Sequence, residues 1–292
     1  MAEISQGSVS ANGVEFSYLT AGDDHAPLAL CLHGFPDSAH GWRYLLSDLA
    51  EAGYRAVAHF QRGYAPTSVP PDGRYQTGAL AMDAIALHGA FDADENAVII
   101  GHDWGASATH GAAVFAPERW AKVVTMAVPP GPARGMAFVS NLAQVQRSWY
   151  MFFFQHALAD FVVPANDLAF IDLLWSQWSP GYDATDDLIA TKASLRDPAN
   201  LAAALGYYRA ALGDGYKDPA LDAVQAAGQC WSPQPHLYLH GRNDGCIGAE
   251  VAEAAAAMAP PNVTVELIED AGHFLHIEQP AVVNARIIEF LT

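Results

Sequence analysis

The chain has 292 residues, of which 51% are hydrophobic and 11% aromatic, enough for one large core or for a core with a smaller second domain. Its 14 basic residues against 32 acidic ones leave a formal charge of −18, which excludes nucleic acid and an anionic membrane surface as natural partners. No run approaches the roughly 20 apolar residues that span a bilayer, and the N-terminus lacks the basic and apolar regions of a secretion signal, so we expect a cytoplasmic protein.

Short apolar runs alternate with helical patterns along most of the chain. The predicted strands are residues 14–19, 28–32, 55–59, 97–100, 123–127, 236–240 and 263–268. The predicted helices between them are residues 42–51, 79–91, 104–115, 248–258 and 281–290. This order predicts an α/β fold, with a largely parallel sheet covered by helices on both faces.

One long interval, residues 131–228, breaks this alternation. It contains no convincing strand, and its helix-like segments are rich in Trp, Tyr and Phe. The Pro-Pro-Gly-Pro sequence at 129–132 marks its beginning, and Ala-Ala-Gly followed by two prolines marks its end. We therefore predict a helical cap at 131–228, inserted into a core formed by residues 1–130 and 229–292. Most of the aromatic rings are expected to form the core of the cap, and some to face what the cap covers.

The sequence GHDWG at 101–105 lies between a predicted strand and a predicted helix. A strand, a tight turn flanked by glycines and a helix form the setting of the nucleophile elbow, whose usual pattern is Gly-x-Ser-x-Gly. Here the central residue is Asp103. A serine attacking a saturated carbon would leave an ether, whereas a carboxylate leaves an ester that water can cleave. Asp103 thus indicates attack on an electrophilic sp3 carbon, such as that of an epoxide or alkyl halide; its structural alternative is a helix N-cap.

Four motifs follow one another in a fixed order: HGFP at 33–36, GHDWG at 101–105, GRND at 241–244 and GH at 272–273. Together they resemble the α/β-hydrolase superfamily, and the aspartate at the elbow narrows the resemblance to its epoxide hydrolase and haloalkane dehalogenase branch. The resemblance covers nearly the whole chain. It implies a mostly parallel central sheet flanked by helices, with an inserted helical cap.

The resemblance also implies a catalytic triad. Asp103 is the nucleophile, and His273 is the general base that activates water, with His276 as its nearest rival. Asp244 is the acid that orients the imidazole of His273 and stabilises its charged form. The alternative role of Asp244 is an Asx turn, which is compatible with the catalytic one.

Hydrolysis of the ester needs donors for the oxyanion that forms on Asp103. By resemblance these are the backbone amides of Phe35 and Trp104, which also border the substrate. Two further motif residues, His33 and His102, are expected to be structural, because their counterparts in the family do not act on the substrate.

The two members of this branch differ in how the leaving group is stabilised. An opening epoxide needs a proton or hydrogen-bond donor, and in epoxide hydrolases two cap tyrosines supply it. The sequence WYMFFFQ at 149–155 resembles the first cap helix of that family and makes Tyr150 the match. In LGYYR at 205–209 the Tyr-Arg pair makes Tyr208 the match, with Tyr207 as the fallback.

A haloalkane dehalogenase is the main alternative, because a halide needs N–H donors and Trp104 could be one. Many dehalogenases have an asparagine where this chain has Phe35, which cannot donate from its side chain. A tryptophan of the cap would have to replace it; the candidates are Trp149, Trp175 and Trp178. An ester or lactone hydrolase is a poor match, because Ser107 lies inside the helix. A ligand receptor without catalysis is a further alternative.

The sequence predicts a reaction that needs neither a metal ion nor a cofactor. The twelve histidines show no metal-ligand spacing such as HExxH, and there is no glycine-rich phosphate loop, so we predict no metal and no cofactor. Three cysteines, Cys31, Cys230 and Cys246, form no CxxC pair and suit a reducing compartment. Relatives that cleave haloacetates have arginines just after the nucleophile, which this chain lacks. The expected partners are thus water and a neutral, largely apolar epoxide that is converted to a vicinal diol.

Overall fold

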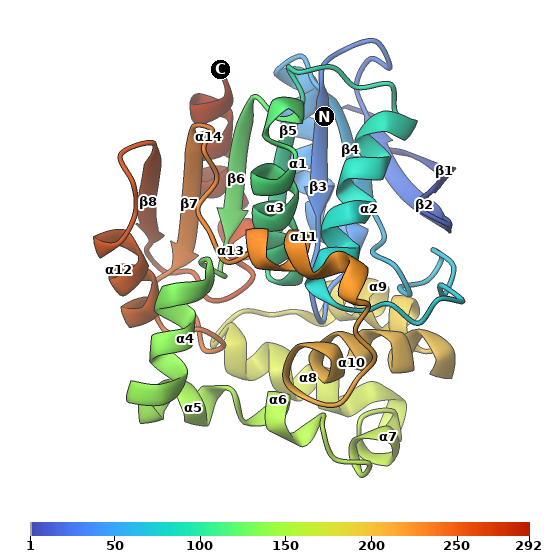
Figure 1. The fold of residues 1–292 in the computed structure, drawn as a ribbon, viewed down its shortest axis with the longest axis vertical. Coiled ribbons are helices and arrows are strands. Elements are labelled where there is room, and N and C mark those ends of the chain that lie inside the picture. The colour runs from blue at the N-terminus through green and yellow to red at the C-terminus, as the bar shows by residue number, and fades with distance from the viewer. Residues whose placement is uncertain (1) are drawn as a thin grey trace.

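A computed structural model describes residues 2–292, so Met1 of the predicted core lies outside the described residues. One eight-stranded sheet runs through the molecule, in the order β1-β2-β4-β3-β5-β6-β7-β8 (Figure 1). The strands are β1 (Ser5–Ala11), β2 (Val14–Ala21), β3 (Leu28–Leu32), β4 (Arg55–His59), β5 (Val98–His102), β6 (Lys122–Met126), β7 (His236–Gly241) and β8 (Val263–Ile268). β2 pairs antiparallel with β1 and β4, and the other neighbours are parallel. The predicted fold class is confirmed.

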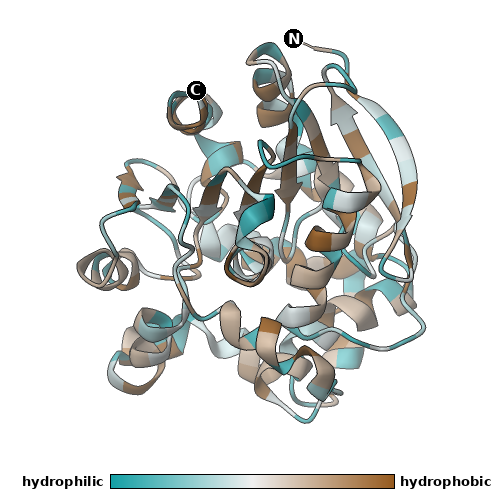
Figure 2. Cartoon of the chain, turned by 45° about the horizontal axis from the view of Figure 1, so that its top comes forward, coloured by the Kyte–Doolittle hydropathy of each residue, from teal (hydrophilic) through white to brown (hydrophobic). Residues whose placement is uncertain are grey.

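Helices cover both faces of the sheet. Those of the core are η1 (Ala39–Trp42), α1 (Arg43–Glu51), α2 (Thr77–Ala90), α3 (Trp104–Phe115), η2 (Pro117–Arg119), α12 (Ala249–Ala257), α13 (Leu275–Glu278) and α14 (Pro280–Leu291). Helices α2 and α3 pack against each other on one face, and α1 packs against α14 on the other (Figure 1). Every residue of β3, β5 and β7 is buried, as expected for strands covered on both faces, and Figure 2 shows the apolar character of the sheet's centre.

The segment between β6 and β7 is built from helices. They are α4 (Gly131–Ser140), α5 (Leu142–Arg147), α6 (Trp149–Phe153), α7 (Ala159–Val162), α8 (Ala165–Trp178), α9 (Thr185–Leu195), α10 (Pro198–Leu212), η3 (Pro219–Leu221) and α11 (Asp222–Ala227). We call this segment the helical insertion. Its helices α4 to α10 lie beyond the carboxyl ends of the parallel strands, whereas α11 returns to pack on α2 and α3 (Figure 1). Within residues 2–292, no helix combines the length and apolar character needed to cross a bilayer.

The sequence prediction was wrong at the N-terminal edge of the sheet, where it missed β1. This strand reads SQGSVSA and is mostly exposed, so it lacks the apolar alternation that identifies a half-buried strand. The sequence did contain a signal, because Asn12 and Gly13 join β1 to β2 with positive φ angles of 47° and 74°. An Asn-Gly pair is the preferred two-residue turn of a β-hairpin.

Two glycines let α3 approach the sheet closely. A Cβ atom at Gly105, in the first turn of α3, would overlap the carbonyl oxygen of Leu32 at the end of β3 and lie 2.5 Å from its carbonyl carbon. A Cβ atom at Gly101 in β5 would overlap the carbonyl oxygen of Gly105. Backbone therefore lies against backbone at this point, and the contact fixes where α3 begins relative to β3 and β5.

Replacing Gly105 by alanine is expected to destabilise the fold by about 1–3 kcal/mol, because the added methyl group must displace the backbone of β3. The matched control is Gly89→Ala: Gly89 is exposed in α2, and no atom would lie within 4 Å of its added Cβ. The control should stabilise the protein by about 0.5–1 kcal/mol through its higher helix propensity. Urea unfolding followed by tryptophan fluorescence measures both changes, and equal stabilities for the two variants would contradict the close contact.

Candidate active site

The turn between β5 and α3 holds Asp103 in a strained backbone conformation. Its φ is 54° and its ψ is −118°, outside the regions that residues with a side chain normally adopt. The side chain makes no capping hydrogen bond to α3, so the helix-cap alternative is not what the geometry supports. The carboxylate instead points away from the helix axis into a cavity that it lines, and Asp103 is only 6% exposed.

Three residues that are far apart in the sequence meet at the carboxyl ends of the strands. Nε2 of His273, in the loop after β8, lies 3.6 Å from Oδ2 of Asp103. Nδ1 of the same ring lies 2.9 Å from Oδ2 of Asp244, in the loop after β7. The other oxygen of Asp244 accepts the backbone N–H groups of Cys246 and Ile247 at 2.7 and 2.9 Å. Asp244 thus forms an Asx turn and contacts His273 at the same time.

The two carboxylates control the protonation of His273. Burial alone lowers the pKa of the imidazole, but the charge of Asp244 and the contacts with Asp103 outweigh it and raise the pKa to about 10. Burial likewise opposes the ionisation of Asp244, yet the charge and hydrogen bond of His273 lower its pKa below the ordinary value. In the free protein at neutral pH, His273 is therefore an imidazolium between two carboxylates.

A backbone amide holds the other oxygen of Asp103. The N–H of Phe35, in the loop after β3, donates to Oδ1 at 2.7 Å. The preceding glycine makes this approach possible, because a Cβ atom at Gly34 would overlap Oδ1 and lie 2.6 Å from the backbone nitrogen of Trp104. Of the two amides that the sequence assigned to an oxyanion hole, that of Phe35 is bonded to the Asp103 carboxylate, and the nitrogen of Trp104 lies beside Gly34 without a hydrogen bond to that carboxylate among the described residues.

The other motif histidines have different surroundings. His276, the rival of His273, stacks between the rings of Trp42 and His102, and its Nε2 lies 3.8 Å from a carboxylate oxygen of Asp37. Burial lowers its pKa well below the usual value. His102 bonds the carbonyl oxygen of His273 through Nε2 at 2.8 Å. In the HGFP motif, His33 bonds the carbonyl of Gly34 and the amide of Gln61. Among the described residues, none of the three side chains forms a hydrogen bond or ion pair with the carboxylate of Asp103.

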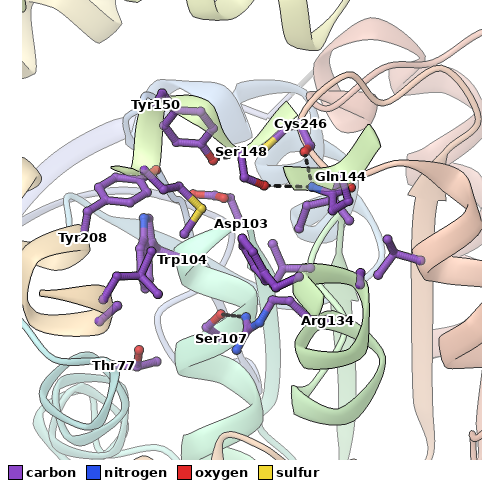
Figure 3. A pocket seen from close by; sticks show the side chains of 18 of the residues that line it. Thr77, Asp103, Trp104, Ser107, Arg134, Gln144, Ser148, Tyr150, Tyr208 and Cys246 are labelled. Atoms are coloured by element: carbon purple, nitrogen blue, oxygen red, sulfur yellow. Dashed lines mark hydrogen bonds between the residues drawn. The ribbon is translucent and has the colours of Figure 1, made fainter. Parts of the chain in front are cut away.

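Asp103 lies on a cavity of about 280 Å³ between the core and the helical insertion (Figure 3). Its aromatic walls are Trp104, Phe138, Tyr150 and Tyr208. Its polar side chains besides Asp103 are Thr77, Ser107, Arg134, Gln144, Ser148, Gln225 and Gln229. The cavity has the size and mixed character of a site for a small organic molecule.

Two tyrosines of the insertion reach this cavity. Tyr150 on α6 and Tyr208 on α10 are buried, and their ring centres lie 5.6 Å apart. The hydroxyl of Tyr150 is 3.3 Å from Sγ of Cys246, while that of Tyr208 has no partner among the described residues. Burial, and then nearby charge including that of Asp103, raises both pKa values well above the usual value, so both phenols remain neutral donors. Tyr207 faces away, and its hydroxyl donates to the carbonyl of Arg62 at 2.8 Å.

Of the four tryptophans considered as halide donors, one offers a free indole N–H group at this cavity. Nε1 of Trp104 has no partner among residues 2–292 and Trp104 lines the cavity. The indole N–H of Trp149 donates to Gln177 at 3.4 Å, and that of Trp175 donates to the carbonyl of Pro36 at 2.8 Å. Trp178 packs on the ring of His273 and does not line the cavity.

Two of the cavity residues that sequence reasoning missed are Cys246 and Arg134. Cys246 is buried beside Tyr150, and burial raises the pKa of its thiol well above the usual value. Arg134, in the first turns of α4, lines the cavity and donates to the hydroxyl of Ser107 at 3.3 Å. No sequence motif singled out Arg134.

The chemistry of the site offers poor ligands for a metal ion. Asp244, Cys246 and His273 place potential ligand atoms within 4.8 Å of one another. A metal would require a thiolate at Cys246, but its raised pKa favours the neutral thiol. The imidazole of His273 is also cationic, with Nδ1 bonded to Asp244 and Nε2 facing Asp103, so it has no free lone pair to offer.

Comparisons with known proteins give a consistent result. A family model described as alpha/beta hydrolase fold matches residues 27–280. The chain is 29% identical over 288 residues to the AB hydrolase superfamily protein YfhM of Bacillus subtilis, covering 97% of this chain and 96% of that protein. It is 30% identical over 332 residues to Epoxide hydrolase B of Mycobacterium tuberculosis, with 92% of each chain covered. The crystal structure of Epoxide Hydrolase A from Mycobacterium thermoresistibile aligns with a TM-score of 0.78 at 26% identity, over 99% of this chain and 98% of that one.

Replacing Asp103 by asparagine is expected to lower the pKa of His273 from about 10 by about 1–3. The substitution removes a negative charge that favours the imidazolium, so the proton is lost at lower pH. Titration of the imidazole signals by NMR measures the change. Asp214→Asn, which removes an exposed charge, is the matched control and should leave the signal where it is. An unchanged His273 titration in the Asp103 variant would show that the two side chains are not coupled.

Proposed function

The chain belongs to the α/β-hydrolase fold family, in its epoxide hydrolase branch, and on this premise we propose that it converts an epoxide into a vicinal diol. The observation that carries the proposal is the convergence of a strained Asp103 carboxylate and two tyrosine hydroxyls, Tyr150 and Tyr208, on one small cavity. We further propose that the helical insertion, residues 131–228, is a cap on a core of residues 1–130 and 229–292. The reaction uses water and no cofactor, and free cysteines at all three positions agree with action in the cytoplasm.

Asp103 opens the epoxide ring in the first step. Oδ1 is held by the amide of Phe35, so the free Oδ2 attacks a ring carbon and the carbon–oxygen bond of the ring breaks. Tyr150 and Tyr208 donate to the ring oxygen and protonate the alkoxide as it forms. The imidazolium of His273 then restores the proton of the tyrosine. The product of this step is an ester between Asp103 and the hydroxyalkyl group, with His273 neutral.

Ester formation itself makes His273 a base. In the free protein the charge of Asp103 helps to raise the pKa of His273 to about 10, which would leave it protonated at neutral pH. Alkylation removes that charge, while burial continues to lower the pKa. The imidazole therefore becomes able to accept a proton only after the ester has formed, which is when a base is needed to activate water. Asp244 remains ionised and keeps the ring oriented through the bond to Nδ1.

Water cleaves the ester in the second step. His273 removes a proton from a water molecule, which attacks the carbonyl carbon of the Asp103 ester. The amides of Phe35 and Trp104 are the proposed donors to the negative charge on Oδ1, and the amide of Phe35 already donates to that oxygen. The intermediate then collapses: the bond to the alkyl oxygen breaks, that oxygen takes the second proton of the water, and the diol leaves. Asp103 keeps the oxygen atom of the water, and His273 is again an imidazolium.

Aromatic rings surround the phenol of Tyr208. The rings of Phe35, Trp104 and Phe154 contact Tyr208 at centre distances of 5.0–5.2 Å. These rings exclude water from the phenol and from the attacking oxygen, which strengthens the hydrogen bonds to the epoxide. An epoxide with an apolar substituent on the ring fits this environment.

A haloalkane dehalogenase with the same triad is the second candidate, and the donors favour it less. Trp104 offers one free N–H group. The indole N–H groups of Trp149 and Trp175 are already bonded, and Trp178 does not border the cavity. A halide would thus have one donor, whereas an epoxide oxygen has two. A receptor without catalysis would not need the two carboxylates, of Asp103 and Asp244, that flank His273.

Replacing His273 by glutamine is expected to stop the reaction after the ester has formed. Asp103 can still attack, but no base activates the water, so the protein gains the mass of one substrate molecule on the peptide that contains Asp103. Mass spectrometry after incubation with an epoxide measures this gain. His156→Gln, at an exposed position of the insertion, is the control and should turn over at the rate of the parent protein. A His273 variant that also does so would overturn the assignment of the base.

Replacing Tyr208 by phenylalanine is expected to slow diol formation by about 100-fold or more, since one donor to the ring oxygen is lost. Tyr207→Phe is the matched control, because its hydroxyl bonds the backbone of Arg62 outside the cavity. A paired assay supplies small panels of epoxides and haloalkanes and quantifies diol and halide. The unmodified protein should release diol without halide. Halide without diol would instead identify Trp104 and a tryptophan of the insertion as a halide site.

A further inference from the structure

The cavity contains a positive charge that the proposed mechanism does not use. Arg134 projects from α4 into the cavity and is half-buried. One nitrogen of its guanidinium donates to the hydroxyl of Ser107 at 3.3 Å. In Figure 3, Ser107 and Arg134 lie on one side of Asp103, and Tyr150 and Tyr208 lie on the other. The cavity therefore has an aromatic side and a cationic side, with the nucleophile between them.

Arg134 differs from every other arginine of the chain. Each of the others lies within 4.0 Å of a carboxylate oxygen. Among residues 2–292, Arg134 makes no ion pair and has one neutral hydrogen bond. The chain has 32 acidic residues for 14 basic ones, so a partner within the fold would be easy to supply. The absence of one at this position, facing a cavity, leaves most of the donors of the guanidinium for a ligand.

The contrast with Arg62 shows what a paired guanidinium looks like in this protein. Arg62 binds both oxygens of Asp83, at 2.5 and 2.6 Å, and also donates to the carbonyl of Arg74. Arg134 has no such arrangement, and its burial lowers the pKa of its guanidinium. The nearest charge in the cavity, Asp103, cannot satisfy it, because its oxygens face Phe35 and His273. A cation enclosed with so few partners is unfavourable unless an anion binds to it.

Further polar groups line the cavity together with Arg134. They are Thr77, Ser107, Gln225 and Gln229. The amide oxygen of Gln225 accepts the backbone N–H of Gly78 at 2.6 Å, so its NH₂ group is the part left to donate. Ser107, which accepts from Arg134, has its own hydrogen free to donate. These groups add neutral donors next to the guanidinium.

We propose that Arg134, assisted by Ser107, binds a carboxylate group of the substrate. This inference rests on the proposed function and specifies it: the preferred epoxide carries a carboxylate on the ring or within a few carbon atoms of it. Ser107 follows Asp103 by four residues in α3, so the two positions are about 6 Å apart along the helix at 1.5 Å per residue. A short acid can thus place its ring at Asp103 and its carboxylate at Arg134.

A carboxylate suits the site better than a phosphate. Arginine binds carboxylates through two parallel hydrogen bonds, and a carboxylate carries one negative charge. A phosphate monoester would bring nearly two charges next to the ionised Asp103, into a chain whose formal charge is −18. The sequence predicted a wholly neutral substrate because no arginine follows the nucleophile. Arg134 lies against Ser107, which occupies one of the positions after the nucleophile, but Arg134 itself comes from the insertion. The proposal therefore replaces the expectation of a wholly neutral substrate.

The test compares two epoxides of the same shape, 3-phenyloxirane-2-carboxylate and its carboxamide. The ratio of their kcat/KM values is measured for the parent protein and for Arg134→Gln. We expect the parent to prefer the carboxylate, and the substitution to reduce that ratio by about 10- to 100-fold, as loss of a charged hydrogen bond implies. Arg196→Gln, which removes a charge exposed on α9's end, is the matched control and should leave the ratio unchanged. An unchanged ratio in the Arg134 variant would overturn the proposal.

Binding measurements separate this proposal from the proposed function. Titration calorimetry with 3-phenylpropanoate and 3-phenylpropanamide, which have no epoxide, should show that the acid binds more tightly and that Arg134→Gln removes the difference. If the parent forms no diol from any epoxide but shows this difference, the proposed function fails and the carboxylate site stands. If diol forms while both ligands bind equally to both proteins, the site fails and the proposed function stands. Should Arg134→Gln not fold, Arg134→Lys replaces it, with a smaller loss of preference because lysine keeps the charge without the paired donors.

Discussion

The backbone strain at Asp103 is the constraint on which the rest of the site depends. A φ of 54° turns the side chain away from α3, whose first amides would otherwise bind it as a cap. The conformation is maintained because Gly101 and Gly105 bring β5, α3 and β3 into backbone contact, with no room for a side chain. The energy needed to hold one residue in this region comes from the packing of the whole sheet. The carboxylate then lies at the carboxyl ends of the parallel strands, where the loops after β3 and β8 reach it and the loop after β7 contacts His273.

Those three loops supply groups that act on one charge. The amide of Phe35 binds Oδ1 of Asp103, and His273 faces Oδ2, so each oxygen has a separate role. Because His273 is also bound to Asp244, its protonation responds to the charge on the nucleophile. Under the proposed mechanism, ester formation cancels that charge, and the imidazole then changes from a proton donor to a base. The buried histidines next to it, His102 and His276, have lowered pKa values and stay neutral. They therefore do not take up the proton that His273 gives or accepts.

The sequence predicted those parts of the structure that local patterns determine. Buried parallel strands are continuous apolar runs, so the limits of β3, β4 and β8 agree with the prediction, and α3 was predicted from its first residue to its last. The polar edge strand β1 has no such pattern. Among candidate site residues, the motifs indicated Asp103, Asp244 and His273, which the structure brings together. Between Tyr207 and Tyr208, adjacent in α10, only the rotation of the helix against the cavity decides, and sequence alone does not give that rotation. Arg134 belongs to no motif at all.

The division between the core and the insertion explains why some residues were recognisable and others were not. Under the proposed mechanism, the core supplies the nucleophile, the base and the amides, whose geometry is the same for any ester of Asp103, so motifs can describe them. The insertion supplies Tyr150, Tyr208 and Arg134 from three different helices, and their positions depend on how these helices pack. Under the proposed mechanism, the insertion therefore determines which substrate binds next to Asp103. A protein of charge −18 repels anions in general. A cation inside the cavity attracts an anion more strongly than one at the surface, because the dielectric constant in the cavity is lower and solvent ions screen the charge less.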